Sequence, residues 1–197
     1  MIKGIIFDLD DTLYSEKQYV YSGYKAVAKF LKRPDGADIM WGFFKEDKPA
    51  IDAYLEMIGE EDKKMECVNV YREHIPEITL YPEVEEKLIK LRKEGLKLGI
   101  ITDGRPNGQR NKIAALGVEP LVDDIIVTDE LGGIQFRKPC DVAFRMMQEK
   151  WGIPFEEMMY VGDNINKDFK APKRLGMKYY WFQNPDGIYS AKAKKPK

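Results

Sequence analysis

The chain has 197 residues, which is enough for one domain with its own hydrophobic core, or for one domain that carries a modest insertion. Its 32 basic and 33 acidic residues give a net charge of -1, a balance that indicates neither nucleic-acid binding nor attraction to an anionic membrane. The two cysteines, Cys67 and Cys140, lie far apart without the spacing of a metal site, which is typical of reduced thiols.

The first predicted element is a strand over residues 2–7, followed at once by three carboxylates, Asp8, Asp10 and Asp11. In a chain that is still nearly extended, Asp8 and Asp10 share a direction, whereas Asp11 points elsewhere and is interpreted as solvated or capping. Like charges this close repel one another unless a cation, a proton or water separates them. The stretch therefore predicts either a metal site or an ordinary solvated loop.

Residues 14–81 come next, and their pattern is almost wholly helical. Helices are predicted from Ser15 to about Leu31 and around residues 37–46, 49–58 and 60–74. A crossover between parallel strands needs only about a dozen residues, so this segment is too long for a plain connection. We predict a small helical cap, residues 14–81, inserted after the first strand of a core domain made of residues 1–13 and 82–190. Residues 191–197 are predicted to be a basic, disordered tail.

The rest of the chain alternates between strands and helices. Four further apolar runs have strand length and composition: residues 96–101, 125–127, 158–161 and 177–182. Between them, helical patterns stop at Gly95, Gly117 and Gly152. Strands that are apolar throughout and alternate with helices are typical of a parallel sheet covered on both faces. The sequence therefore predicts an α/β fold with a doubly wound, Rossmann-like parallel sheet.

Polar side chains follow several of these strands at the point where each strand ends. Asp8 follows the first strand, Thr102 and Asp103 follow the second, and Asp163 follows the fourth. The carboxyl ends of parallel strands meet at one edge of the sheet, where such folds bind ligands, so we expect these residues to converge. Clustered carboxylates suit Mg2+, which also neutralises charge that would repel an anionic substrate.

Two further features suit a phosphorylated ligand. Lys138, in the turn RKP, adds a fixed positive charge, and Thr102 can donate a hydrogen bond to a phosphoryl oxygen. The backbone N–H groups around Asp103 and Gly104 can donate in the same way. We therefore expect Thr102, Asp103, Gly104 and Lys138 to bind phosphate.

Four motifs resemble those of the haloacid dehalogenase (HAD)-like hydrolase superfamily in order and spacing. They are DLDDT at residues 8–12, GIIT ending at Thr102, the lysine of RKP at Lys138, and VGDNINKD at residues 161–168. The resemblance extends from Ile5 to about Ile188, and the helical segment stands where members of this family carry a C1 cap.

The resemblance implies a phosphoaspartyl mechanism. Asp8 is expected to attack phosphorus and to hold the phosphoryl group. Asp10 is expected to protonate the leaving oxygen and then to deprotonate the attacking water. Thr102 would bind a phosphoryl oxygen, and Lys138 would hold Asp8 and the phosphoryl charge.

The resemblance also implies the Mg2+ ligands. They are Asp8, the backbone carbonyl of Asp10, and Asp163, with Asp168 either a direct ligand or a neighbour of the ligands. Asp168 has a competing interpretation as the N-cap of a helix that runs toward Leu175.

Two positions depart from the family pattern. Asp103-Gly104 stands where cap-bearing members often have asparagine after the threonine, so the orientation of Asp103 stays open. Asn164 stands where serine or threonine is frequent.

Substrate contacts are predicted at two places, each with a structural alternative. Trp41 and Phe43 in the cap are candidates because Gly42 between them permits close approach, although their spacing also fits the cap interior. Arg105 and Asn107 are candidates beside Thr102, although they also fit a loop that starts a helix. His74 is expected to bind the terminal carbonyl groups of a cap helix.

These observations predict a magnesium-dependent phosphatase for a small phosphorylated metabolite, either a sugar phosphate or a nucleotide monophosphate. A phosphomutase of the same family is the enzymatic alternative. A phospho-receiver module or a non-catalytic binding module is the alternative from another class, although a receiver has its acidic pair before its phosphoacceptor, lacks a cap and is shorter. No apolar run reaches the roughly 18 residues of a membrane span, and no signal-peptide pattern is present. We expect a cytoplasmic monomer or homodimer.

Overall fold

The computed structural model of the protein describes residues 1–188, and these residues form two compact units. One unit consists of Met1–Glu16 together with the chain from Thr79 onward, and the other consists of Lys17–Ile78. The first is an α/β unit and the second is helical. The predicted tail, residues 191–197, lies outside the described residues.

The α/β unit is built on one parallel sheet of five strands. The strands are β1 (Gly4–Phe7), β2 (Lys97–Thr102), β3 (Asp124–Val127), β4 (Met158–Gly162) and β5 (Lys178–Trp181). Their order across the sheet is β3-β2-β1-β4-β5, and every neighbouring pair is parallel. This arrangement confirms the predicted doubly wound α/β fold.

The central position of β1 decides where the site forms. Phe7, the last residue of β1, is opposite Ile100 of β2 and Val161 of β4. The segments that follow β1, β2 and β4 therefore leave the sheet side by side, and the chain order reverses here between β2 and β4.

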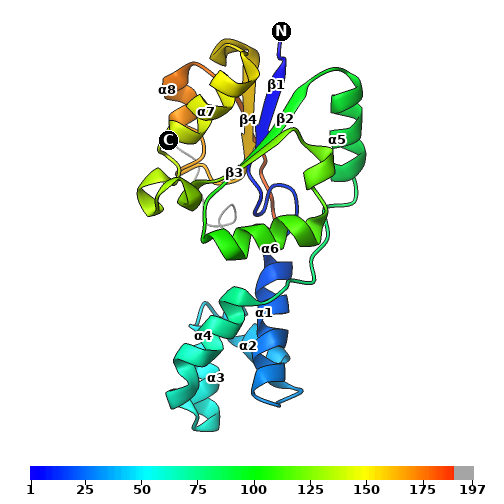
Figure 1. Cartoon of the computed structure of the whole chain (residues 1–197). Helices are drawn as coiled ribbons and strands as arrows, with labels where there is room; N and C mark the ends of the chain where they lie inside the picture. The colour runs from blue at the N-terminus through cyan, green and yellow to red at the C-terminus, as the bar shows by residue number, and fades with distance from the viewer. Residues whose placement is uncertain (189–197) are drawn as a thin grey trace. The chain divides into compact units, whose positions relative to one another are not determined.

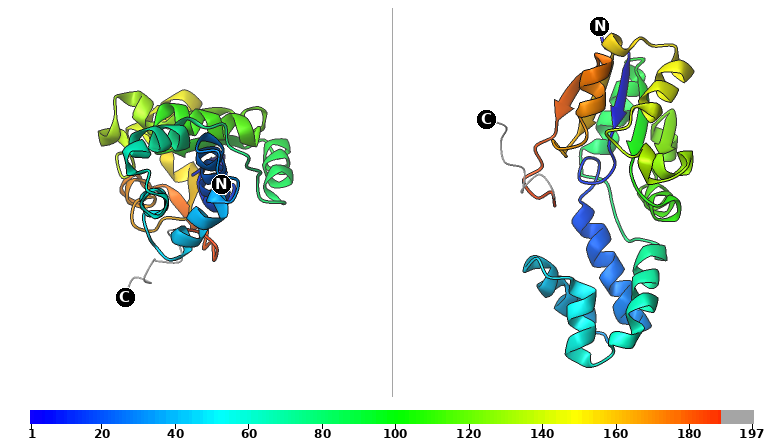
Figure 2. Two further views of the ribbon diagram at one scale, coloured as in Figure 1. Left: turned by 90° about the horizontal axis from the view of Figure 1, so that it is seen from below. Right: turned by 90° about the vertical axis from the view of Figure 1, so that its left-hand side faces the viewer.

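Helices lie on both sides of the sheet (Figures 1 and 2). They are α5 (Val84–Lys93), α6 (Pro106–Leu116), α7 (Val142–Trp151) and α8 (Lys170–Leu175), with short 3-10 turns at Glu119–Leu121, Thr128–Leu131, Ile134–Phe136 and Phe155–Glu157. Because alternate side chains of a strand point to opposite faces, Ile6 and Tyr160 pack with Phe144 and Met147 of α7 in one buried cluster.

The ends of α6 and α7 follow directly from the sequence. Each helix is followed by a glycine in the left-handed conformation, Gly117 and Gly152, both with φ 62°. The N–H of each glycine donates back into the last turn, to Ala114 O and Gln148 O. Glycine adopts this conformation without the steric cost of a Cβ, so these two predicted helix stops are confirmed.

The helical unit has an interior rich in aromatic residues. Its helices are α1 (Glu16–Phe30), α2 (Gly36–Lys45), α3 (Ala50–Ile58) and α4 (Lys64–Glu73), with a 3-10 turn at Glu61–Lys63. Glu16, the first residue of α1, belongs to the first segment of the α/β unit. Trp41 stacks on Phe44 with ring centroids 5.0 Å apart, and Lys48 lies over the ring of Phe43. Trp41 and Phe43 thus have partners inside this unit, and their contact with a substrate stays a prediction.

His74 follows α4 at the C-cap position, and its Nδ1 lies 2.7 Å from Tyr71 O. This contact to a carbonyl group of the last turn confirms the predicted role of His74.

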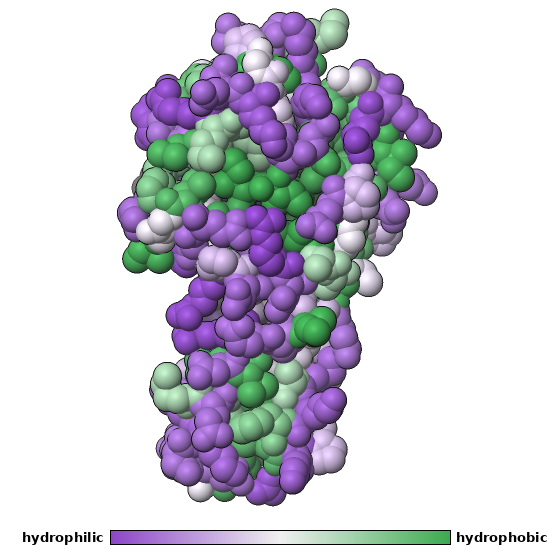
Figure 3. Space-filling model, in the orientation of Figure 1, coloured by the Kyte–Doolittle hydropathy of each residue, from purple (hydrophilic) through white to green (hydrophobic). Residues whose placement is uncertain are grey.

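The surface mixes hydrophilic and hydrophobic residues on the face that Figure 3 presents. Large apolar residues exposed in the α/β unit include Ile89, Ile134, Met146, Tyr179 and Tyr180. Within residues 1–188, no helix is both long enough and apolar enough to cross a membrane.

Candidate active site

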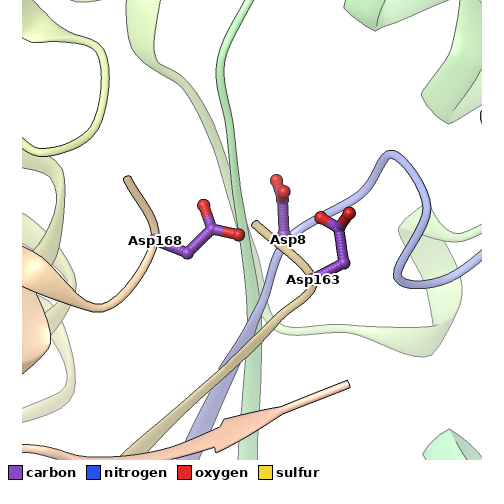
Figure 4. Close-up of side chains that lie close together, drawn as sticks. All are labelled: Asp8, Asp163 and Asp168. Carbon is purple, nitrogen blue, oxygen red and sulfur yellow. The ribbon is translucent and has the colours of Figure 1, made fainter. Parts of the chain in front are cut away.

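Three carboxylates gather where β1 and β4 end. The Asp8 N–H donates to Val161 O at 2.8 Å, which extends the β1–β4 pairing as far as Asp8. Asp8, Asp163 and Asp168 are at most 3% exposed, and their carboxylate oxygens lie within 4.8 Å of one another. Figure 4 shows Asp8 from the end of β1, with Asp163 and Asp168 from the segment after β4. Two of them line a pocket of about 350 Å³, whose lining residues are Asp8, Asp10, Glu16, Asp103, Arg137, Lys138, Asp163, Asn164 and Lys167.

This group fits a hard divalent cation. It offers only carboxylate oxygens, and such oxygens are the ligands that Mg2+ prefers. Asp168 Oδ1 is buried and lies 2.9 Å from Lys138 Nζ, so Lys138 already compensates part of the negative charge of this group. Asp8, Asp163 and Asp168 would hold the ion. The carboxylate of Asp10 is not a member of this group of three.

Asp168 does not cap a helix. α8 begins at Lys170 with Phe169 at the N-cap position, and Asp168 Oδ2 accepts the N–H of Asn164 at 2.9 Å. The competing interpretation of Asp168 was therefore wrong, because its carboxylate turns back toward the loop after β4.

Lys138 lies between two of the three carboxylates. Its Nζ is 2.7 Å from Asp8 Oδ1 and 2.9 Å from Asp168 Oδ1, and it also donates to the hydroxyl of Tyr160 at 2.8 Å. Burial alone would lower the pKa of Lys138, but Asp168 and Asp8 hold it well above its usual value. Burial raises the pKa of Asp8 to about 6, although the charge of Lys138 opposes this shift. Lys138 is therefore a fixed cation beside a carboxylate that is costly to ionise.

Asp10 has a different set of partners. Its Oδ1 lies 2.7 Å from Lys112 Nζ and accepts the Tyr14 hydroxyl at 2.5 Å, and its Oδ2 accepts Gln109 Nε2 at 3.0 Å. Burial by itself would raise the pKa of Asp10, but Lys112, helped by the hydrogen bonds from Tyr14 and Gln109, lowers it below its usual value. The carboxylate of Asp10 is thus oriented, and its charged form is stabilised.

Thr102 is the last residue of β2 and Asp103 follows it, and the two side chains have different partners. Thr102 is fully buried, and its Oγ1 accepts Gln109 Nε2 at 2.5 Å. Asp103 accepts hydrogen bonds at 3.0 Å from the Thr128 hydroxyl, the Lys138 N–H and Lys167 Nζ. Burial would raise the pKa of Asp103, but the charges of Lys138 and Lys167 lower it. The negative charge of Asp103, which stands where family members often have asparagine, is therefore balanced by these nearby donors.

Gly104 and the two residues predicted to contact substrate follow Asp103. Arg105 lies at the N-cap position of α6 with Pro106 as the first helical residue, and Arg105 and Asn107 are exposed. The loop does start a helix, which supports the structural alternative, and their contact with substrate stays a prediction. Gly104 has φ 148°, a conformation that favours glycine.

Asp11 corrects part of the sequence interpretation. It is fully buried, so it is not solvated. Its Oδ1 accepts the N–H of Glu16, the first residue of α1, at 2.9 Å, and its Oδ2 accepts the N–H of Ile188 at 2.6 Å. The capping role is confirmed, and the carboxylate also ties the far end of the described chain to this loop.

Sequence reasoning missed six residues of the site: Tyr14, Glu16, Gln109, Lys112, Arg137 and Lys167. A signal existed for two of them, because Gln109 and Lys112 stand three residues apart on the helix that follows the Thr102 loop and so share a face. Glu16 lines the pocket, where burial and the charge of Asp10 raise its pKa to about 8.

Comparison with known proteins agrees with this geometry. Residues 5–182 match the family model described as haloacid dehalogenase-like hydrolase. The chain belongs to this family. One relative, the glyceraldehyde 3-phosphate phosphatase of Methanocaldococcus jannaschii, is 33% identical over 192 residues that cover 90% of this chain and 83% of the relative. The phosphoserine phosphatase of Thermus thermophilus is 30% identical over 130 residues, which cover 66% and 51% respectively.

Solved structures share the fold of this HAD-like hydrolase. A HAD-superfamily hydrolase from Geobacter sulfurreducens aligns with a TM-score of 0.71 at 18% identity, covering 93% of this chain and 88% of that chain. A HAD-hydrolase from Bacillus subtilis aligns with a TM-score of 0.66 at 21% identity, covering 94% and 88%. The predicted family, the α/β fold and an enzyme of the hydrolase class are confirmed.

Proposed function

We propose that this HAD-like hydrolase is a magnesium-dependent phosphatase that acts on a small phosphorylated metabolite through a phosphoaspartyl intermediate on Asp8. The observation that carries the proposal is that two carboxylates of one loop have different partners. Asp8 pairs with Lys138 and belongs to the group of three carboxylates that could bind a metal ion, whereas Asp10 pairs with Lys112. The names of the relatives, both phosphatases, support the reaction class.

The first half of the reaction transfers the phosphoryl group to Asp8. A carboxylate oxygen of Asp8 forms a bond to phosphorus while the bond from phosphorus to the ester oxygen breaks. Asp10 enters this step in its protonated form, gives its proton to that oxygen and is left ionised. Thr102 and Lys138 bind the phosphoryl oxygens and stabilise their charge. Mg2+ held by Asp8, Asp163 and Asp168 would neutralise charge between the carboxylates and the phosphate.

The second half releases phosphate. Asp10 takes a proton from a water molecule whose oxygen attacks phosphorus, and the bond between phosphorus and Asp8 breaks. The ionised state of Asp10 suits this half, because a general base must accept a proton.

The pocket lining favours an uncharged, hydroxylated leaving group. Within the α/β unit the lining includes five carboxylate residues, Asp8, Asp10, Glu16, Asp103 and Asp163, but only three cations, Arg137, Lys138 and Lys167. Each of these cations also contacts a carboxylate, so no strong attraction is left for a second anionic group. We therefore propose a sugar phosphate, with triose phosphates such as glyceraldehyde 3-phosphate foremost, in line with the first relative.

The test is a phosphate-release assay with and without Mg2+, first on an aryl phosphate and then on glyceraldehyde 3-phosphate, a hexose phosphate, a nucleotide monophosphate, phosphoserine and pyrophosphate. We expect metal-dependent release that is fastest on sugar phosphates. Release that survives Asp8→Asn would contradict the mechanism. Conversion of one sugar phosphate isomer to another without net release would establish the mutase instead.

A further inference from the structure

Gln109 joins two residues of the proposed machinery. It lies in the first turns of α6 and is 4% exposed. Its Nε2 is 3.0 Å from Asp10 Oδ2 and 2.5 Å from Thr102 Oγ1. An amide oxygen at this position would face the carboxylate of Asp10 and repel it, so the nitrogen belongs there and directs one hydrogen to each acceptor.

This contact decides what the Thr102 hydroxyl does. A side-chain amide nitrogen only donates, so Thr102 Oγ1 must accept from Gln109. The hydroxyl has one hydrogen of its own, which this contact leaves free for another acceptor. Thr102 is fully buried at the end of β2, and β2 pairs with β1, the strand that Asp8 follows, so an acceptor is expected on the side of Asp8.

We propose that Gln109 is a positioning residue that makes Thr102 a hydrogen-bond donor to a phosphoryl oxygen and at the same time orients Asp10. The proposal rests on the proposed phosphatase function. Gln109 acts through Thr102 and Asp10 and does not itself touch the reacting atoms.

Gly104 supports this arrangement. A Cβ built on Gly104 would lie 3.0 Å from Gln109 Cγ and 3.1 Å from Gln109 Cδ. Any side chain at position 104 would therefore press on Gln109 and disturb its two hydrogen bonds. The glycine that follows Asp103 thus keeps space for the Gln109 side chain.

Asp10 has two anchors besides Gln109, whereas Thr102 has no other donor to its oxygen within the described residues. Lys112 and Tyr14 both bind Asp10 Oδ1. Loss of Gln109 therefore acts chiefly through Thr102 and hence on phosphate binding. A purely structural role would lower the amount of folded enzyme and leave the inhibition constant of phosphate unchanged.

The decisive variant is Gln109→Glu, which keeps the shape of the side chain but replaces the donor by an acceptor. Its carboxylate repels Asp10 and accepts the Thr102 hydrogen, so the hydroxyl turns away from the phosphate. We expect inhibition by inorganic phosphate to weaken about tenfold and kcat/KM to fall about 100-fold, as for loss of one charge-stabilising donor. Gln109→Leu leaves the Thr102 hydroxyl free to rotate. Its phosphate inhibition and its kcat/KM should lie between those of Gln109→Glu and those of the wild type.

The matched control is Arg110→Gln on the same helix. Arg110 pairs with Glu130, so this change perturbs α6 without reaching Asp10 or Thr102, and its phosphate inhibition should equal that of the wild type. Thr102→Val completes the test when it is made both in the wild type and in Gln109→Glu. It should weaken phosphate inhibition clearly in the wild type but hardly change it in Gln109→Glu. Additive losses, or unchanged phosphate binding by Gln109→Glu and Gln109→Leu, would overturn the proposal.

Calorimetric binding of inorganic phosphate with Mg2+ tests it even if no phosphatase activity is found, so failure of the proposed function is recognised separately.

Discussion

The surroundings of Asp8 and of Asp10 shift the pKa values of these two carboxylates of one loop in opposite directions. Asp8 is buried among other carboxylates with Lys138 as its cation, and its pKa is raised to about 6. Asp10 receives Lys112, Tyr14 and Gln109, and its pKa is lowered. Environments that push two carboxylates apart in this way allow them to take different roles.

The difference shows which carboxylate depends on an added cation. The protein itself stabilises the charge of Asp10, whereas the charge of Asp8 is left short of compensation beside Asp163 and Asp168. A bound Mg2+ would supply that compensation. The repulsion between carboxylates that the sequence shows is therefore concentrated on the Asp8 side.

The largest expected effect follows from removing the nucleophile. Asp8→Asn should lower phosphatase activity by about four orders of magnitude, because no group remains to hold the phosphoryl group. Acid quenching of a reaction with labelled aryl phosphate should find no covalent phosphate on the variant. Labelled protein after this change would show that another residue is the acceptor.

Asp10→Asn should remove the proposed acid and base and leave the proposed nucleophile, Asp8, in place. The loss of acid and base catalysis should slow turnover by about 100-fold to 10,000-fold, while Asp8 remains able to attack an aryl phosphate with a good leaving group. The same acid quench should therefore trap covalent phosphate that the wild type turns over too fast to accumulate. Equal behaviour of Asp8→Asn and Asp10→Asn would remove the distinction between the two carboxylates.

Lys112→Met should reduce the difference between the pKa values of Asp8 and Asp10. Without the cation, the pKa of Asp10 rises, so the acidic limb of the pH–rate profile should move to higher pH and activity at low pH should fall about tenfold. Lys97→Met, which removes a surface pair with Asp123, is the control and should leave the profile unchanged. An unmoved limb would mean that Lys112 does not set the charge of Asp10.

The smallest effect concerns the stability of the metal-free protein. The pKa of Asp8 is raised from 3.8 to about 6, so its contribution to stability is complete below the usual pKa and is lost as the pH rises through about 6. At pH 8 this ionisation costs about 3 kcal/mol, and the uncharged Asp8→Asn variant should melt several degrees higher in EDTA.

Asp10→Asn is the matched comparison for that measurement. A lowered pKa means that Asp10 contributes stability above its usual pKa, a contribution that is lost as the pH falls through the folded value. Asp10→Asn should therefore melt lower than the wild type at pH 8. Shifts of the same sign for both variants would contradict the opposite pKa shifts.

Most of the secondary structure could be predicted, because apolar periodicity and helix-stopping glycines are local. The predicted strand at 125–127 is β3 at Asp124–Val127, and the predicted helices at 37–46 and 49–58 are α2 and α3 within one residue at each end. Asp8, Thr102 and Asp163 could be expected to meet because each directly follows a strand of a parallel sheet.

Partners that depend on side-chain direction could not be predicted. Lys112 reaches Asp10 from 102 positions away, and nothing in its own neighbourhood on the chain identifies that partner. The sequence interpretation also left Asp11 solvated in one of its two alternatives, because its contact with the Ile188 N–H joins residues 177 positions apart.

By itself, the sequence determined the fold class, the order of the strands along the chain and the presence of carboxylates, a threonine and a lysine at strand ends. These follow from local patterns and from the geometry of parallel sheets. Only the tertiary structure decided the charge state of each carboxylate and which of them form the metal-binding group. A pKa depends on burial and on charges that lie near in space, and the chain brings both from distant segments.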